Sequence, residues 1–158
     1  DYQINLMVIT MKNIYSVLNE ALVIVFNLVL KAEEKFIRSL GVNLSITEIH
    51  TLEAIASDVE KPMSEIASRL SITLGTLTTS INNLEKKGFL KRKRSEKDRR
   101  VVIVNLTEKA HDIMEKHTSF HENMVHEIVT ELNKQEEYAL MKALNNLIDY
   151  FTNKYGEE

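Results

Sequence analysis

A cluster of positive charge near the middle of the chain most constrains what this sequence can fold into. Residues 86–100 hold nine Lys or Arg and two acidic residues, a net charge of +7, whereas the 158-residue chain as a whole carries −3. The remaining 143 residues therefore carry −10. A basic segment this concentrated on an acidic protein is typical of a local surface that binds phosphate groups, rather than of a generally basic protein.

The residues that precede this cluster have the periodicity of an amphipathic helix. Apolar side chains recur at spacings of three and four from Leu74 to Leu84, with Leu77 and Ile81 between them, which predicts that they share one face. The opposite face carries short hydroxyl and amide side chains and one lysine: Thr76, Thr79, Asn83 and Lys87, with Thr78, Ser80 and Asn82 on its flanks. Such hydroxyls and amides are mediocre helix formers, but they can read base edges in a DNA major groove. We expect Thr73 to cap the start of this helix and Gly88 to end it.

Two short β-strands are predicted after this helix. The first has the sequence FLKRKR, and the second, VVIVNL, is rich in β-branched residues. The intervening SEKDRR has no Gly, so we expect a longer, solvent-exposed loop rather than a tight two-residue turn. A helix followed by a basic hairpin is the layout of a winged helix. A solvated charged hairpin on an ordinary helical domain is the alternative, but the adjoining hydroxyl and amide helix favours DNA binding.

A helix-turn-helix is predicted upstream of the hairpin. Ser45 and Glu48 fit a capping box that opens one helix. Its inward positions are expected to be apolar: Ile49, Leu52, Ile55 and Ala56. Pro62 can sit in the first turn of the next helix, whose Ala67 is small enough for a close helix crossing. Residues 71–72 form the turn into the polar-faced helix.

Long helices are predicted on both sides of this region. The apolar residues between 12 and 40 spread over more than half of a helix surface, which indicates burial on several sides and hence a partner chain, and Gly41 is expected to end this helix. Thr107 and Asn133 are expected to cap two further helices. We therefore predict a mainly α protein, a winged helix-turn-helix with N- and C-terminal dimerisation helices and a small β-hairpin wing. The predicted parts are a dimerisation helix at 12–40, a DNA-binding region at 44–107 and C-terminal dimerisation helices at 108–156.

Composition excludes several other classes of protein. The absence of cysteine excludes a disulfide framework and a thiolate metal site, and one Pro and four Gly favour a mostly helical chain. The most apolar run, residues 21–30, is too short to span a bilayer and is not framed as a signal peptide, so we expect a cytoplasmic protein. Residues 1–10 are either an extended arm or not native, with Met11 as an alternative start. No Gly-rich phosphate loop or nucleophile–base pair indicates an enzyme.

The second strand carries a motif that resembles a known family. Residues 98–107, DRRVVIVNLT, match the D-x-R-x-x-x-[apolar]-x-L-T signature of the MarR family of bacterial transcription regulators. Within that family, TLGTLTTSINNLEKKGFL and RSEKDRRVV are most similar to the branch that represses fatty-acid biosynthesis genes in Gram-positive bacteria. The resemblance implies a homodimer, built by the N- and C-terminal helices, on a pseudo-palindromic operator. It also implies that Arg100 enters the minor groove, held by Asp98, with Arg99 as an alternative.

Further DNA contacts are predicted from the side-chain chemistry. We expect major-groove contacts from the polar face of the helix: Thr76, Thr79 and Asn83. Phosphate contacts are expected from hydroxyls and cations at the edge of that surface: Thr78, Ser80, Lys91, Lys93, Arg94 and Lys97. For each of these residues, an ordinary solvated side chain is the alternative, and for Arg94 a structural ion pair is another.

The identity of the effector is the property that the sequence constrains least. No cofactor is required and no metal ligand is assigned. The resemblance implies an acyl chain carried on acyl carrier protein, and four adaptable apolar residues suit such a chain or simply form core: Met63, Met114, Phe120 and Met124. The alternative is zinc, because His50, His117 and His121 resemble ligands of zinc-sensing members, with Glu33 or Glu34 as a fourth ligand. A helical protein-interaction module without DNA binding is a second alternative, although it would not need the basic hairpin.

Overall fold

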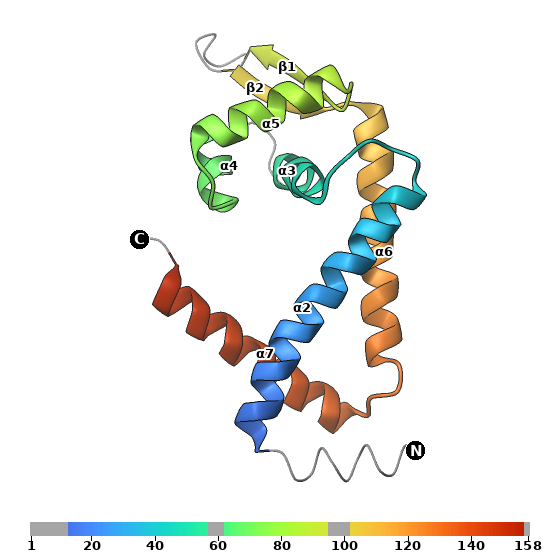
Figure 1. The fold of residues 1–158 in the computed structure, drawn as a ribbon, viewed down its shortest axis with the longest axis vertical. Helices are drawn as coiled ribbons and strands as arrows, with labels where there is room; N and C mark the ends of the chain where they lie inside the picture. Colours follow the sequence, from blue (N-terminus) through green and yellow to red (C-terminus); the bar gives the residue numbers. More distant parts are fainter. Residues whose placement is uncertain (1–12, 57–61, 95–101, 157–158) are drawn as a thin grey trace. The chain divides into compact units, whose positions relative to one another are not determined.

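The computed structural model describes residues 13–56, 62–94 and 102–156, which form six helices and one two-stranded antiparallel sheet (Figure 1). The elements are α2 (Ile14–Ser39), α3 (Ile46–Ala56), α4 (Met63–Arg69), α5 (Leu74–Lys86), β1 (Leu90–Arg94), β2 (Val102–Leu106), α6 (Glu108–Val129) and α7 (Lys134–Tyr155). The predicted mainly α winged helix is confirmed. The chain divides into two compact units, residues 1–114 and 115–158, and α6 begins in the first and continues into the second.

The predicted helix caps are present. In the capping box of α3, the Ser45 hydroxyl accepts from the Glu48 backbone N–H at 3.2 Å, and a Glu48 carboxylate oxygen accepts from the Ser45 N–H at 2.9 Å. Asn133 and Glu136 form the same reciprocal pair at the start of α7. Gly41, just after α2, has φ +66°, the left-handed conformation that favours glycine at this position.

The helix-turn-helix consists of α4, a short turn and α5. Ile66 and Ala67 of α4 are buried with the apolar face of α5, as predicted. The turn contains Ser71, a non-glycine residue at φ +51° whose N–H donates to the Ser68 carbonyl at 2.9 Å. Pro62 precedes the first turn of α4 as its N-cap, and the Thr73 hydroxyl caps α5 by accepting from the Thr76 N–H at 3.1 Å.

Two of the apolar positions predicted to face inward do not. Leu74, the first residue of α5, is 50% exposed, because the first turn of the helix extends past the surface that covers Leu77 and Ile81. Ala56, the last residue of α3, is exposed, whereas Ala54 and the polar Thr51 are buried instead. The periodicity therefore identified the inward face correctly in the middle of these helices and failed at their ends.

The wing pairs its two strands in an antiparallel register from Leu90 opposite Leu106 to Arg94 opposite Val102. Helix α5 contacts β1, and α3 contacts both α5 and β2 (Figure 1). Phe89, Leu90, Ile103 and Val104 are buried, which anchors the base of the wing in the core of the first unit. The predicted loop between the strands falls on residues 95–101, outside the described residues.

The junction of the wing with α6 is organised by Thr107. Its hydroxyl donates to the Gly88 carbonyl at 2.9 Å and accepts from the Ala110 N–H at 3.3 Å. The backbone N–H of Thr107 donates to the Phe89 carbonyl at 3.0 Å. The predicted cap of α6 is therefore confirmed, and it also connects the end of α5 to the start of α6.

Large apolar side chains are exposed along the two terminal helices of the chain. In α2 they include Phe26 at 64% exposed and Leu28 at 58%, and no residue of α7 is buried. By length and composition alone, α2 is long and apolar enough to cross a membrane, with a mean hydropathy of 1.6 over an 18-residue window that is longer than the run 21–30.

Candidate nucleic-acid interface

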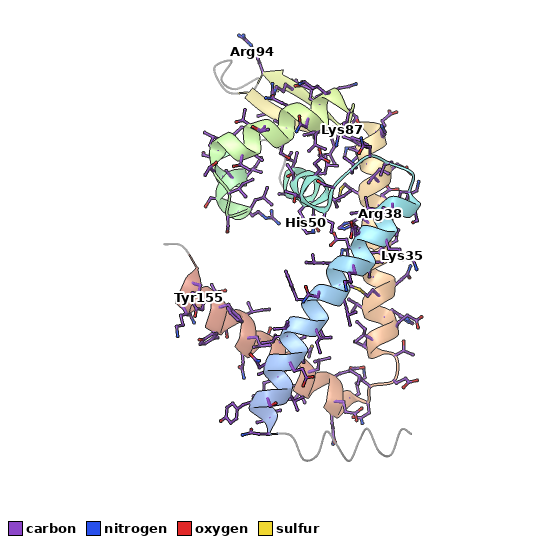
Figure 2. The ribbon with its side chains drawn as sticks, viewed as in Figure 1. Lys35, Arg38, His50, Lys87, Arg94 and Tyr155 are labelled. Atoms are coloured by element: carbon purple, nitrogen blue, oxygen red, sulfur yellow. The ribbon has the colours of Figure 1, made fainter. Side chains whose placement is uncertain are left out.

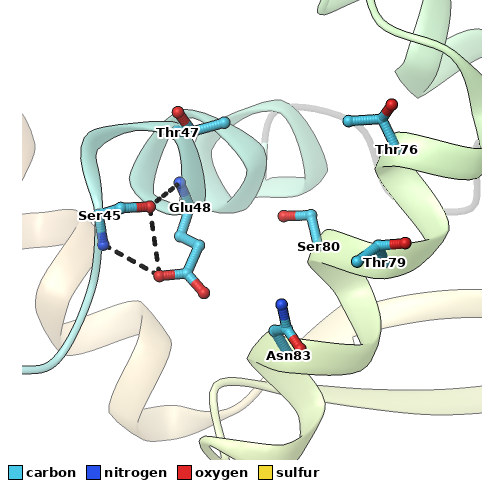
Figure 3. Close-up of a pocket in the computed structure, with 7 residues that line it drawn as sticks. All are labelled: Ser45, Thr47, Glu48, Thr76, Thr79, Ser80 and Asn83. Atoms are coloured by element: carbon cyan, nitrogen blue, oxygen red, sulfur yellow. Dashed lines mark hydrogen bonds between the residues drawn. The ribbon is translucent and has the colours of Figure 1, made fainter.

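The polar face of α5 forms one wall of an open hollow on the surface of the first unit. Thr76, Thr79, Ser80 and Asn83 line it from α5 (Figure 3). The opposite wall comes from the first turn of α3, through Ser45, Thr47 and Glu48, and the hollow measures about 470 Å³. The three residues predicted to read base edges, Thr76, Thr79 and Asn83, are all exposed there. They can therefore reach a ligand that enters from solvent.

The threonine hydroxyls of α5 are already engaged within the helix. The Thr78 hydroxyl donates to the Leu74 carbonyl at 2.8 Å, and the Thr79 hydroxyl donates to the Gly75 carbonyl at 3.1 Å. The Thr76 hydroxyl lies 2.8 Å from that of Thr73. A hydroxyl whose proton is used in this way presents its methyl group and oxygen lone pairs outward, which suits the methyl group of thymine or a donor on a base.

Ser80 lies on the side of α5 that faces α3. Its hydroxyl is 3.2 Å from that of Thr51, a residue only 1% exposed, and the Thr51 hydroxyl also lies 2.8 Å from the Thr47 carbonyl. Ser80 is therefore half-buried and linked to α3, although it still lines the hollow. Its predicted phosphate contact stays a prediction.

The carboxylate of Glu48 is neutralised by a lysine at the end of α5. Lys87, the C-cap of α5, donates to both Glu48 carboxylate oxygens at 2.8 Å. Burial opposes ionisation of Glu48, but the hydrogen bonds from Lys87 and from the Ser45 N–H outweigh it and lower the pKa of the carboxyl below its ordinary value. The pair connects the start of α3 to the end of α5, so Lys87 acts in the fold rather than as a free cation.

The cations of β1 differ in exposure and in pairing. Lys91, Lys93 and Arg94 are exposed, and Figure 2 shows Arg94 extending outward from the end of the strand. Lys91 and Arg94 have no hydrogen-bond or ion-pair partner within the described residues, so the structural ion pair considered for Arg94 is not found there. Arg92 is paired with α5, because its Nη1 lies 3.4 Å from a Glu85 carboxylate oxygen. The remaining predicted contacts, Lys97, Asp98, Arg99 and Arg100, lie outside the described residues.

The predicted effector residues are distributed over both units. In the first unit, His50 Nε2 lies 3.0 Å from a carboxylate oxygen of Glu33, which is 2% exposed. In the second unit, His121 Nε2 lies 3.1 Å from His117 Nε2. The apolar candidates divide in the same way: Met63 and Met114 belong to the first unit, Phe120 and Met124 to the second. Glu34, the other acid considered as a zinc ligand, pairs instead with Arg38 at 2.5 Å.

Sequence reasoning missed the wall that α3 contributes to the hollow. The sequence pattern of Ser45 and Glu48 indicates only a capping box, and nothing in it distinguishes Thr47 as a lining residue. The signal was available, because a capping box places two polar side chains at the first turn of a helix. The sequence does not show that the folded chain packs this turn next to α5.

A polar-faced helix in a helix-turn-helix, flanked by a basic two-stranded wing, defines a winged-helix DNA-binding protein. A family model described as transcriptional regulator SarA/Rot matches residues 35–117. Streptococcus pneumoniae FabT, solved in complex with DNA, is 39% identical with a TM-score of 0.81, over 88% of this chain and 98% of FabT. The chain therefore belongs to the MarR family of winged-helix transcription regulators, and the likeness to FabT supports the fatty-acid branch that its sequence resembles.

Two further relatives differ in the share of their own length that aligns with this chain. The uncharacterized HTH-type transcriptional regulator YkoM of Bacillus subtilis is 31% identical over an alignment that covers 62% of this chain and 64% of YkoM. Lactococcus lactis ZitR, a zinc-responsive MarR family member of solved structure, is 28% identical over 70% of this chain and 78% of ZitR, with a TM-score of 0.55. These relatives are transcriptional regulators rather than enzymes.

Proposed function

We propose that this protein is a dimeric, sequence-specific repressor of fatty-acid biosynthesis genes that acts in the cytoplasm. The observation that carries the proposal is the exposed polar face of α5 beside the basic strand β1, on a chain 39% identical to FabT over nearly its whole length. Thr76, Thr79 and Asn83 read base edges in the major groove, and Lys91, Lys93 and Arg94 contact phosphates. The wing residues Lys97 to Arg100 complete the interface, with Arg100 in the minor groove.

The dimer is formed by the exposed apolar faces of α2 and α7. Phe26 and Leu28 of α2 and Leu144 and Ile148 of α7 are each between 48% and 64% exposed in the single chain, which a soluble monomer would not favour. A second copy of the chain covers these faces. Two-fold pairing then presents two α5 helices to half-sites separated by roughly one DNA turn, ~34–36 Å.

The effector is an acyl chain delivered by acyl carrier protein. Support comes from the likeness to the fatty-acid branch and from apolar side chains that suit an acyl chain: Phe120 and the adaptable Met63, Met114 and Met124. Zinc is the alternative effector. It is favoured by the His117–His121 pair, whose Nε2 atoms lie 3.1 Å apart on one face of α6, and by the likeness to ZitR.

DNA binding is tested by fluorescence anisotropy on duplexes from upstream of the fatty-acid biosynthesis operon of the source organism, with shuffled duplexes as the control. We expect tighter binding to the native sequence and a steep fall in affinity with salt. Equal binding to native and shuffled duplexes would contradict the proposed target. A DNA affinity that does not change with salt concentration would instead favour a protein-interaction module.

The effector is tested by native mass spectrometry of the full-length protein purified from its source. A retained acyl mass that increases operator affinity when added back supports the acyl proposal. A retained zinc ion that is lost in the His117→Ala, His121→Ala double variant supports the alternative. Acyl carrier protein loaded with a long chain, compared with the unloaded carrier, then shows whether the carrier contributes to binding.

A further inference from the structure

Arg92 bridges the wing to α5. From its place on β1, one nitrogen of its guanidinium, Nη1, lies 3.4 Å from a carboxylate oxygen of Glu85, and the other, Nη2, donates a hydrogen bond to Oδ1 of Asn82. Glu85 and Asn82 are three residues apart on α5, so they form adjacent positions on one face of that helix. The planar guanidinium therefore binds Glu85 and Asn82 at the same time, through two nitrogens in a fixed geometry. A lysine ammonium is a compact point charge and lacks this fork.

The bridge also fixes the orientation of the Asn82 amide. An arginine has only donors and stays charged, so the amide group that faces it must be the carbonyl oxygen, not the NH₂. The NH₂ of Asn82 is therefore turned away from Arg92. Asn82 is half-buried and precedes the exposed Asn83, so it lies at the boundary between the wing side and the polar face of α5.

We infer that Arg92 is a positioning residue for DNA recognition, and that it makes Asn82 a donor-only reader of the operator. Arg92 sets the wing at a fixed angle to α5 and presents the Asn82 NH₂ to an acceptor on a base, such as N7 or O6 of guanine or N7 of adenine. Asn82 then discriminates against a base that offers a donor at that place. This inference rests on the proposed DNA-binding function and adds a reader that the polar face of α5 alone does not identify.

Arg94 provides a matched comparison, because it is the same residue type two positions along the same strand. It is exposed and has no partner within the described residues, whereas Arg92 is held by two. A free arginine that meets a phosphate releases a counterion on binding, so its loss lowers the slope of log affinity against log salt by about 0.9 for each contact. A positioning arginine that never meets a phosphate lowers affinity without changing that slope.

The experiment uses the full-length protein and a duplex that the parent protein selects from a randomised 30-base-pair library. We expect Arg92→Ala to weaken binding by about tenfold with an unchanged salt slope, as for loss of a charged hydrogen-bond pair. We expect Arg94→Ala to reduce the slope. Thermal melting of each variant shows that it folds, and Arg92→Lys, which keeps the charge but not the fork, should fail to restore affinity.

The role of Asn82 is tested by repeating the selection with variants. Asn82→Asp retains an acceptor for Arg92 and removes the outward donors, so we expect the base preference at one operator position to relax while preferences at the other positions remain. Uniform weakening at every position would mean that the new charge only repels DNA, and it would overturn the reader role. An Arg92→Ala, Asn82→Ala double variant should lose less affinity than the two single losses combined, because the contact between Arg92 and Asn82 can be removed only once.

The outcomes separate this inference from the proposed function. A parent protein that enriches no duplex overturns both. If the parent protein enriches a duplex but Arg92→Ala lowers the salt slope as much as Arg94→Ala does, only the positioning role is overturned. Arg92 would then be a phosphate ligand. Additive effects of Arg92→Ala and Asn82→Ala would likewise show that the two residues act independently and would overturn the inference.

Discussion

Ser71, in the turn between α4 and α5, has a backbone conformation that its side chain disfavours. Its φ of +51° lies in the left-handed region, where a residue with a Cβ is strained by roughly 1–2 kcal/mol. The turn keeps this conformation because the Ser71 N–H donates to the Ser68 carbonyl and the next N–H, of Ile72, donates to the Ala67 carbonyl. The strain therefore lies at the point that sets the angle between the two helices.

Replacing Ser71 with Gly should relieve that strain. We expect Ser71→Gly to raise the free energy of unfolding by about 0.5–1 kcal/mol, since the positive φ costs glycine nothing. Ser68→Gly, inside α4, is the matched control and should lower it by about 1 kcal/mol. Chemical denaturation of the three proteins measures both effects, and a Ser71→Gly variant less stable than the parent would show that the serine side chain stabilises the turn.

Glu48 should make the stability of the protein depend on pH in the acid range. Its pKa in the folded protein is lowered, so its contribution to stability is fully present above its ordinary pKa of about 4.5 and is lost as the pH falls through the lower folded value. Glu48→Gln should cost about 1–3 kcal/mol at neutral pH and flatten the stability profile below pH 4.5. Urea unfolding from pH 3 to 7 measures this, with Glu53→Gln on the exposed side of α3 as the control. Parallel pH profiles for the parent and Glu48→Gln would contradict the prediction.

At the scale of single residues, the sequence predicted the caps well and the ion pairs poorly. Caps such as Thr73 and Asn133 depend on neighbours within four positions, so a local pattern contains the whole interaction. The pairing of Lys87 with Glu48 joins residues 39 positions apart, and the choice of Arg92 rather than Arg94 depends on how β1 lies against α5. A charge count cannot distinguish these cations.

At the scale of elements, the reliable signal was the periodicity of α5 and the apolar composition of β2. Helix α5 packs one face on the core, so the spacing of its apolar residues reports their burial, whereas the adjacent Ile103 and Val104 of β2 are both buried, as its continuous apolar run indicates. The hollow between α3 and α5 was not predictable, because it requires the first turn of α3 to lie beside the polar face of a helix that follows it in the sequence by almost thirty residues. Nothing in the local pattern of either helix specifies that contact.

The close crossing of α4 with the rest of the helix-turn-helix depends on Ala67. This side chain is 4% exposed and packs in the core of the first unit. We expect Ala67→Leu to lower the free energy of unfolding by roughly 1–3 kcal/mol through overpacking. Thermal melting is the measurement, and Ser68→Leu on the exposed side of α4 is the control. An Ala67→Leu melting temperature equal to that of the parent would show that the crossing has room for a larger side chain.

At the scale of the whole molecule, the apolar surfaces of α2 and α7 should bring two chains together. We expect Phe26→Glu to shift the protein from dimer to monomer in light scattering and to weaken operator binding by a factor on the order of 10², because each half-site is then bound alone. Lys35→Glu, an exposed change on the same helix, should leave the dimer intact. A parent protein that is already monomeric, or a Phe26→Glu dimer that stays intact, would contradict the role given to α2.

The side chain of Thr107 has a consequence for how this molecule responds to anything that moves α6. One hydroxyl accepts the capping hydrogen bond of α6 and also donates to the carbonyl of Gly88, immediately after the helix that faces the hollow. A shift of the first turn of α6 would therefore disturb the hydrogen bond to the Gly88 carbonyl, which lies between α5 and β1. The hydroxyl oxygen of Thr107 therefore links the start of α6 to the end of α5, the helix whose polar face lines the hollow.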